Sequence, residues 1–300
     1  MSTLNSTTST TRPTLGAGDV GKSYFETDSN KILVWDSAAW REWNYDLVTT
    51  PGADNNNFSL SVDGVDDYLN CGNIGDLAGS TAYTLAFWWK PSVSGESPSI
   101  GVRQNISNQY HIYKSNFIIA TGGVSPSSKT KSFTEPTGTD WRYYVLSYDA
   151  GSVFLHINGT QIFSETGFPP SLMTSTSSTH ALQIGRYTTL SGSSFNSQGL
   201  IDEVALWDSA LSTSAAITLY NSGNAFDVTA DSGSYNDSAN LIGYWKCGDG
   251  SSDTAVAGVP SDGATVSGVQ NIANPGTNDA TGTNGATYAS KSADSNNVPY

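Results

Sequence analysis

Charged side chains are scarce in this sequence, and basic ones are the scarcest. Only 13% of the 300 residues are charged, and 13 Lys and Arg stand against 27 Asp and Glu, which gives a formal net charge of −14. Globular chains usually contain about 25% charged residues. Such an acidic balance argues against binding to a nucleic-acid backbone. Polarity comes instead from Ser, Thr, Asn and Gly, as is typical of a loop-rich β protein.

Cysteines are equally rare, and long apolar runs are absent. Cys71 and Cys247 are the two cysteines, so two interpretations stay open: both thiols are buried, or they form a single bridge. No apolar stretch is long enough to cross a bilayer, so membrane insertion is not expected. The N-terminus, MSTLNSTTSTTRPT, has no hydrophobic region. It predicts a flexible arm over residues 1–14 rather than a secretory signal.

One stretch, GLIDEVALWDSAL at residues 199–211, combines a strand signal with two adjacent carboxylates. Its alternating apolar residues predict a half-buried strand. Asp202 and Glu203 are neighbours, so on a strand their side chains point to opposite faces, and one leans inward unless a bulge turns it. A buried carboxylate needs backbone donors, a cation or a metal, because a bare charge in the interior is costly. Asp208 or Ser209 is then expected to cap a short helix.

Four further blocks precede this stretch in a fixed order. They are FSLSVDGVDDYL at residues 58–69, YTLAFWWKP at 83–91, WRYYVLSYDAGSVFLHING at 141–159 and LQIG at 182–185. Together with residues 199–211, they resemble the strand pattern of the laminin-G-like, concanavalin-A-like jelly-roll family. The resemblance implies an all-β fold, a jelly-roll β-sandwich over residues 58–223. It does not select a function, because this fold carries lectins, glucanases, adhesion modules and viral parts.

A separate small β-meander is predicted over residues 15–46. Its strand signals lie at residues 23–27, 31–35 and 39–43, with turns between them. The block GKSYFETDSNKILVWDSAAW resembles a segment common in tail and fibre proteins of bacteriophages, although Ser37 stands where that segment usually has Gly. The simpler alternative is an ordinary aromatic hairpin.

This small unit carries three tryptophans, Trp35, Trp40 and Trp43. A unit of this size buries little surface by itself, so its aromatic side chains need a partner surface. We therefore predict that it attaches the protein to other virion proteins. Residues 47–57 are expected to be a linker. Residues 224–300 are expected to be an extension that adds edge strands to the jelly roll and ends in a tail.

Catalytic constellations are missing from the sequence. Glucanases of this fold carry carboxylates that alternate along one strand and face one groove, and no strand signal here has that pattern. His111, His156 and His180 are scattered, and His156 is expected to be a packed side chain on a strand. We therefore predict that the protein is not an enzyme.

A calcium site is one of two predicted ligand sites. Asp63, Asp66 and Asp67 lie in the turn DGVDD, and Asp202 lies on the later strand. The resemblance implies a calcium held by such a turn, and oxygen ligands suit this ion. The predicted ligands are Asp63, Asp66 and Asp202. The alternative is that Asp63 only shapes the turn and that Asp202 accepts hydrogen bonds from backbone amides.

A sugar-stacking face is the other predicted site. Trp88, Tyr144 and Tyr148 lie on two long strand signals, and aromatic rings of this kind offer flat surfaces to sugar rings. The alternative for these side chains is a covered sheet face or a subunit contact.

Taken together, these patterns predict a structural virion protein of a bacteriophage: a fibre, an appendage or a capsid-decorating component. Its lectin-like domain would bind host-surface glycans, the chain would form a homo-oligomer, and the protein would be located in the virion. The alternative is a free bacterial carbohydrate-binding or adhesion module.

Overall fold

The computed structural model describes two parts of the chain. These are residues 5–7, 23–26, 31–35 and 40–43, and then residues 56–291 and 299, without 75–76, 106–107, 122–123, 173–180, 189–193 and 225. The chain divides into two compact units, Met1–Ala53 and Asp54–Tyr300, and each is described by itself.

The described backbone of the first unit forms one sheet. Its strands follow the order β1 (Asn5–Thr7), β2 (Ser23–Glu26), β3 (Lys31–Trp35) and β4 (Trp40–Trp43). Strands β2 to β4 lie where strands were predicted, and Trp35 and Trp40 are register partners. Within the predicted arm, residues Asn5–Thr7 form β1, which pairs in parallel with β2. The rest of the predicted arm lies outside the described residues.

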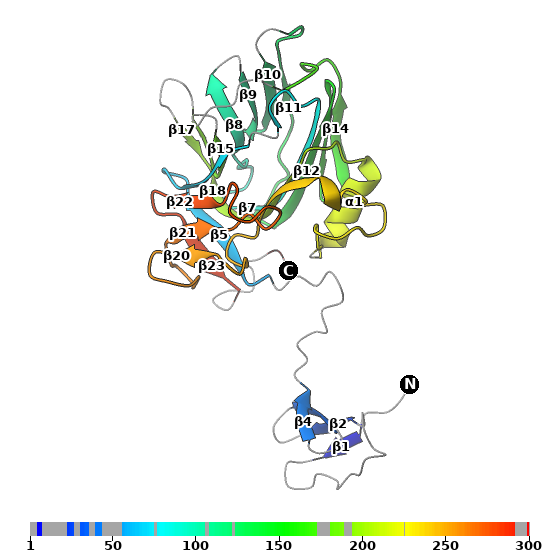
Figure 1. Cartoon of the computed structure of the whole chain (residues 1–300), viewed down its shortest axis with the longest axis vertical. Coiled ribbons are helices and arrows are strands. Elements are labelled where there is room, and N and C mark those ends of the chain that lie inside the picture. The colour runs from blue at the N-terminus through cyan, green and yellow to red at the C-terminus, as the bar shows by residue number, and fades with distance from the viewer. Residues whose placement is uncertain are drawn as a thin grey trace. The chain divides into compact units, whose positions relative to one another are not determined.

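The second unit is an all-β sandwich of two antiparallel sheets (Figure 1). Over the described residues, the first is a nine-stranded sheet, in the order β11 (Ser128–Ser132), β10 (Asn116–Thr121), β9 (Asn108–Tyr113), β8 (Ile100–Asn105), β15 (Ala181–Ile184), β6 (Tyr68–Asn73), β22 (Ala280–Thr283), β21 (Val266–Val269) and β20 (Thr254–Ala255). The second is an eight-stranded sheet, in the order β14 (Thr160–Glu165), β13 (Ser152–Ile157), β12 (Arg142–Asp149), β7 (Ala82–Pro91), β18 (Gln198–Trp207), β5 (Phe58–Asp63) and β23 (Thr287–Ser290), with β19 (Leu241–Trp245) paired to β18.

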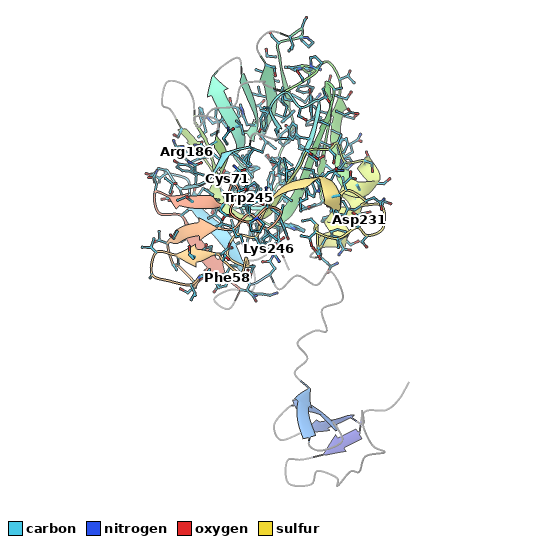
Figure 2. The ribbon with its side chains drawn as sticks, viewed as in Figure 1. Phe58, Cys71, Arg186, Asp231, Trp245 and Lys246 are labelled. Carbon is cyan, nitrogen blue, oxygen red and sulfur yellow. The ribbon has the colours of Figure 1, made fainter. Side chains whose placement is uncertain are left out.

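The main core lies between the two sheets, where side chains fill the space (Figure 2). Strand β7 contributes alternate residues to it, Tyr83, Leu85, Phe87 and Trp89, as the alternation of the sequence predicts. Each of these four side chains is at most 4% exposed. The two-sheet arrangement therefore follows from ordinary period-two burial.

A second apolar cluster covers the outer face of the eight-stranded sheet. Trp88 of β7 and Tyr143 of β12 pack there with residues of helix α1 (Thr213–Tyr220). The helix begins one residue after Ser212, whose side chain accepts a hydrogen bond from the Ala215 amide. The predicted caps, Asp208 and Ser209, are therefore wrong. Because this cluster lies opposite the main core, the central strands are buried on both faces.

Residues beyond the predicted sandwich boundary complete both sheets. Strand β22 lies between β6 and β21, and β23 pairs with β5, the first strand of the sandwich. A short hairpin of β16 (Arg186–Thr188) and β17 (Ser194–Asn196) forms a separate two-stranded sheet. No helix in the described part of the chain has both the length and the apolar composition that crossing a membrane requires.

Candidate functional site

The three residues predicted to stack on sugars do not form an exposed face. Trp88 is 3% exposed, and Tyr144 and Tyr148 are fully buried. Trp88 belongs to the outer cluster, whereas the two tyrosines belong to the core between the sheets. Tyr144 pairs with Phe87, an inward residue of β7, which places it on the face opposite Trp88. The prediction of a shared stacking surface is therefore wrong.

An aromatic cluster of His111, Tyr113, Tyr187 and Phe195 lies elsewhere, on the outer face of the nine-stranded sheet. Tyr110 and Ile112 point into the core, so His111 and Tyr113 point outward by alternation. The Tyr187 ring lies 4.0 Å from His111 and 4.5 Å from Tyr113 between centroids, and both pairs are stacked. Phe195 lies 5.4 Å from Tyr113. Tyr113 and Phe195 are partly exposed, so the cluster presents aromatic surface to solvent.

Backbone features hold this cluster in place. Gly101 of β8 pairs with His111, and a Cβ at this glycine would lie 2.2 Å from the His111 Cβ. Only glycine allows His111 to fit so closely against β8. Lys114 and Ser115 form the turn after β9, with left-handed φ angles of 46° and 55°. The turn brings the Lys114 ammonium group to 3.8 Å from the Phe195 ring centroid, which is a cation–π contact.

The acidic turn of Asp63, Asp66 and Asp67 joins β5 to β6. One oxygen of each carboxylate lies within 4.8 Å of the others. The Asp63 carboxylate accepts a hydrogen bond of 2.7 Å from the Val65 amide, and Asp67 accepts one of 3.1 Å from the Asp63 amide. These two carboxylates therefore shape the turn, as the simpler alternative held for Asp63. Burial, with the charges of Asp63 and Asp66, raises the pKa of Asp67 to about 6.

The acidic turn and the aromatic cluster are neighbours. The side-chain amide of Asn196, next to Phe195 on β17, donates a hydrogen bond to the Val65 carbonyl in the acidic turn. The Arg186 guanidinium group lies 4.3 Å from the ring centroid of Tyr68, which directly follows the turn. Aromatic surface, two cations and several carboxylates thus meet in one region. Such a mixture suits a polar ligand with flat apolar faces.

Asp202 does not join the acidic turn. Asp63 pairs with Gln198 on β18, and Asp202 lies about 13 Å farther along that strand. The three predicted calcium ligands therefore do not converge, and Asp67 stands in the place expected for Asp202. Asp202 is fully buried, and its carboxylate accepts a hydrogen bond of 2.8 Å from the Glu203 amide. The sequence left open whether a bulge turns one of the two adjacent carboxylates. A bulge is present, because the pairing of β18 with β7 shifts between Asp202 and Ala205 and Glu203 has a φ of 50°.

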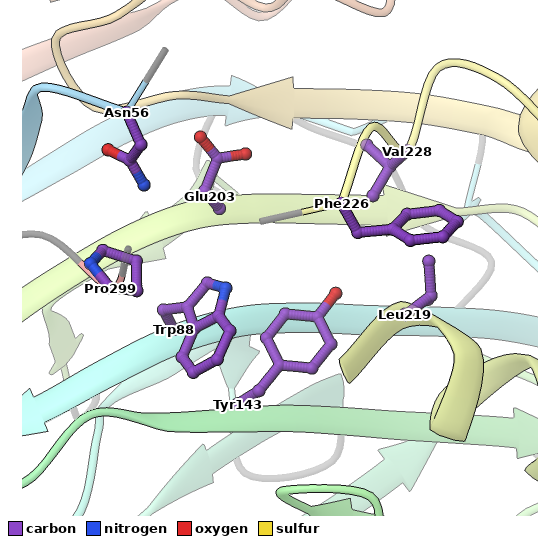
Figure 3. A pocket seen from close by; sticks show the side chains of 8 residues that line it. All are labelled: Asn56, Trp88, Tyr143, Glu203, Leu219, Phe226, Val228 and Pro299. Carbon is purple, nitrogen blue, oxygen red and sulfur yellow. The ribbon is translucent and has the colours of Figure 1, made fainter. Parts of the chain in front are cut away.

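Beside Asp202, a small pocket opens on the outer face of the eight-stranded sheet (Figure 3). Trp88 and Tyr143 lie on one side of it, with Glu203 and Asn56 across from them. Leu219, Phe226, Val228 and Pro299 complete its lining. The Tyr244 hydroxyl donates a hydrogen bond to the Glu203 carboxylate. Trp88 therefore belongs to a pocket, but not to an exposed aromatic surface.

The remaining candidate residues have structural roles or lie outside the described part. Cys71 and Cys247 are buried free thiols, so the bridged alternative is wrong. His156 is 1% exposed and packs edge-on against Phe154, which confirms the expected packed side chain. His180 lies outside the described residues. For Trp35, Trp40 and Trp43, the structure describes the backbone only.

The aromatic cluster could be anticipated only in part from the sequence. Alternation along Tyr110–Tyr113 predicts that His111 and Tyr113 share a face. Tyr187 and Phe195 come from a hairpin that carries no strong strand signal, in a segment rich in Ser, Thr and Gly. Contact between side chains so far apart in sequence depends on how the hairpin folds over β8 and β9.

A protonation effect on stability follows from two carboxyl groups, those of the buried Asp67 and the half-buried Asp249. Burial raises the pKa of Asp67 to about 6, and burial likewise raises the pKa of Asp249 to about 6, against 3.8 for an ordinary Asp. Between pH 3.8 and about pH 6, the native state therefore binds more protons than the unfolded state. The stability that this extra proton binding contributes is lost as the pH rises through 6. We expect a higher melting temperature at pH 5 than at pH 7.5. Asp67→Asn and Asp249→Asn should each flatten this profile, whereas a profile that is flat in the unsubstituted protein would contradict the assignment.

The two facing antiparallel sheets and the helix on the outer face of one of them define a concanavalin A-type β-sandwich. The chain belongs to the concanavalin A-like lectin/glucanases superfamily, whose sequence pattern matches residues 63–216. The fold expected from the sequence is thereby confirmed. A comparison with curated protein sequences found no match.

Solved structures share the fold at low identity. A Bacteroides ovatus protein to which carbohydrate binding is ascribed is 16% identical, with a TM-score of 0.49, over 78% of this chain and 60% of that one. A heptameric pentraxin from Limulus polyphemus is 15% identical, with a TM-score of 0.41, over 55% and 82%. The enzymatically active domain of tailspike protein 2 from bacteriophage CBA120 is 16% identical, with a TM-score of 0.39, over 57% and 27%. At these values, none of the three indicates a ligand or an activity for this chain.

Proposed function

We propose that the protein is a carbohydrate-binding module that holds a glycan against the aromatic cluster on the outer face of the nine-stranded sheet. The observation that carries this proposal is the partial exposure of Tyr113 and Phe195 beside the acidic turn. The C–H faces of sugar rings pack on aromatic surface, and hydroxyl groups bond to carboxylates and cationic donors. The region around the cluster supplies all three kinds of group.

The electrostatics of the region favour a ligand rich in hydroxyl groups over a highly charged one. Lys114 and Arg186 are both engaged with aromatic rings, and Asp63 and Asp66 are exposed nearby. Asp63 and Asp66 would repel a strongly anionic ligand, and Lys114 and Arg186 would repel a strongly cationic one. Hydroxyl groups donate hydrogen bonds to carboxylates and accept hydrogen bonds from basic groups.

We propose further that binding occurs without cleavage. No strand in the sequence carries the alternating carboxylates of the glucanases of this fold. A binding role needs only a surface that holds its ligand, and the aromatic cluster supplies one.

Location in a bacteriophage particle remains a second, narrower proposal. It rests on the resemblance of residues 21–40 to segments of phage tail and fibre proteins, and a free bacterial module fits the sandwich equally well. Mass spectrometry of purified particles decides between them: a stoichiometric virion component supports the phage assignment, and its absence from particles supports the free module.

Removing the exposed rings should weaken glycan binding. After a glycan array has identified a ligand, we expect Tyr113→Ala and Phe195→Ala each to weaken binding by about 2–12-fold, because an aromatic contact contributes about 0.5–1.5 kcal/mol. Titration calorimetry measures the change, and unaltered circular dichroism checks folding. Val256→Ala, at a site 74% exposed, is the matched control and should bind normally. Unchanged affinity in both aromatic variants would contradict the proposed site.

A further inference from the structure

Two Asn–Gly pairs occur in the sequence, Asn158–Gly159 and Asn284–Gly285. The side-chain amide of an Asn can be attacked by the backbone nitrogen of the next residue, and glycine hinders this attack least because it has no Cβ. Both pairs lie in turns where the Asn has a left-handed φ, 52° at Asn158 and 61° at Asn284. The two pairs are therefore alike in sequence and in φ, and their surroundings decide which of them reacts.

The pair at Asn284 lies in the short turn between β22 and β23, and both of its residues are exposed. The side-chain amide of Asn284 donates a hydrogen bond of 3.1 Å to the Asp66 carbonyl at the protein surface. An exposed hydrogen bond of this kind is readily exchanged for bonds to water, so it opposes rotation of the side chain only weakly. The Asn284 side chain can therefore turn toward the Gly285 nitrogen, and water has access to the product of the attack.

A carboxylate lies against the glycine of this pair. A Cβ placed on Gly285 would lie 3.4 Å from Oδ1 of Asp67, which is a contact distance. The other carboxylate oxygen, Oδ2, accepts a hydrogen bond of 3.1 Å from the Asp63 amide, so the carboxylate is held in this position. The backbone nitrogen must lose its proton as it attacks, and a positioned carboxylate is suited to accept that proton.

The pair at Asn158 is held more firmly and has an aromatic neighbour. The Asn158 amide donates a hydrogen bond of 2.9 Å to the Tyr143 carbonyl, and the Asn158 side-chain oxygen accepts one of 2.8 Å from the Tyr143 amide. Rotation of this side chain toward the glycine would break the second, partly buried bond. A Cβ placed on Gly159 would lie 3.0 Å from Cδ1 of Tyr220, so an aromatic ring lies against this glycine.

We propose that Asn284 is a site of spontaneous deamidation, with Asp67 as the proton acceptor. The Gly285 nitrogen gives its proton to Asp67 and forms a bond to Cγ of Asn284. The bond between Cγ and the side-chain nitrogen then breaks, and ammonia leaves with the proton that Asp67 had accepted. Water opens the resulting succinimide ring at one of its two carbonyl groups, which gives isoaspartate or aspartate. The reaction consumes water, releases ammonia and needs no oxidant or reductant.

The product would alter the connection between the two sheets. Strand β22 belongs to the nine-stranded sheet and β23 to the eight-stranded sheet. A carboxylate at residue 284 cannot donate a hydrogen bond to the Asp66 carbonyl, and it adds negative charge beside the acidic turn. Isoaspartate also lengthens the main chain by a carbon atom within a short turn. We therefore expect the modified protein to be less stable, and this inference does not depend on the proposed glycan binding.

Peptide mapping by mass spectrometry of the full chain, incubated at mildly alkaline pH, tests the proposal. Conversion of the side-chain amide to a carboxyl group should be at least about tenfold faster at Asn284 than at Asn158. In denaturant the two pairs should convert at similar rates, because their surroundings are then lost. Asp67→Asn should slow conversion at Asn284 and leave Asn158 unaffected. Asp66→Asn keeps the backbone carbonyl, so it is the matched control and should leave both rates unchanged.

Two further variants test the consequence for stability. Asn284→Gln keeps an amide donor but does not readily form the ring, so residue 284 should stay unmodified. Asn284→Asp carries the charge of the product and should melt at a lower temperature than Asn284→Gln. Native protein in which Asn158 converts as fast as Asn284, or a difference that persists in denaturant, would overturn the proposed site. Conversion at Asn284 that Asp67→Asn leaves unchanged in a folded variant would overturn the role of Asp67.

Discussion

Replacing Arg142 by Ala should cost about 3–5 kcal/mol of folding free energy. Arg142 is 2% exposed, its guanidinium lies 3.8 Å from the Glu135 carboxylate, and it donates a hydrogen bond of 2.6 Å to the Gly138 carbonyl. Glu135 is 6% exposed. Loss of the arginine removes the positive charge beside this buried carboxylate and leaves it the Tyr144 hydroxyl and the Ser97 side chain as hydrogen-bond partners. Denaturant unfolding measures the loss, and the melting temperature should fall by roughly 6–20 °C.

Two controls separate the buried charge from the lost contacts. Lys131→Ala removes an ion pair with Glu165 in which both side chains are about one-third exposed, so its loss should be far smaller than that from Arg142→Ala. Adding Glu135→Gln to Arg142→Ala should recover part of the stability, because the amide carries no charge. A loss from Arg142→Ala no greater than that from Lys131→Ala would show that the buried pair does not stabilise the sandwich.

Removal of the first unit should abolish assembly and leave the sandwich intact. A shortened protein that begins at Asn55 keeps every strand of the second unit, which is compact by itself. It should therefore be soluble, rich in β structure and unchanged in melting temperature. It should also lose homo-oligomers and incorporation into particles, since the predicted attachment residues Trp35, Trp40 and Trp43 are removed. Light scattering after size-exclusion chromatography, with mass spectrometry of particles, measures both effects.

A full-length variant with these three tryptophans replaced by alanine is the matched control. It should show the same loss as the shortened protein if the aromatic side chains make the contacts. Retained assembly in this variant, with loss in the shortened protein, would assign attachment to other residues of the first unit. Normal assembly of the shortened protein would exclude the attachment role altogether.

The fold could be predicted because its strand signals are local. Alternation in residues 83–90 predicts that Phe87 and Trp89 share a face, and both lie in the core. An Asn-Gly pair is typical of a hairpin turn, and Asn158–Gly159 joins β13 to β14. Alternation alone does not tell which face of a strand meets which neighbour. Trp88 and Tyr144 lie in separate strand signals and were predicted to share one sugar-stacking face. The register between β7 and β12 instead places their side chains on opposite faces of the sheet. That register depends on pairing between distant segments.

Burial on both faces of the sheet explains why the predicted sugar site was wrong. An outward aromatic residue on a sandwich strand is exposed only if nothing packs over it. Here helix α1 and the residues that follow it cover Trp88 and Tyr143. The predicted calcium site is wrong for a related reason. Asp63 and Asp202 lie on paired strands but at different positions along them, so their carboxylates do not come together. Sequence order shows that two carboxylates are present, but it does not show their separation along a sheet.

Strands β22 and β23 pair with β6 and β5, the first strands of the sandwich, and this pairing affects how the protein folds during its synthesis. Leu60 of β5 pairs with Tyr288 of β23, and Leu69 of β6 pairs with Gly282 of β22. Neither sheet can be completed until β22 and β23 have left the ribosome. Contacts between such distant residues make folding slow. Until then, β5 and β6 each have one unpaired edge, and such edges are the sites through which nascent β chains aggregate.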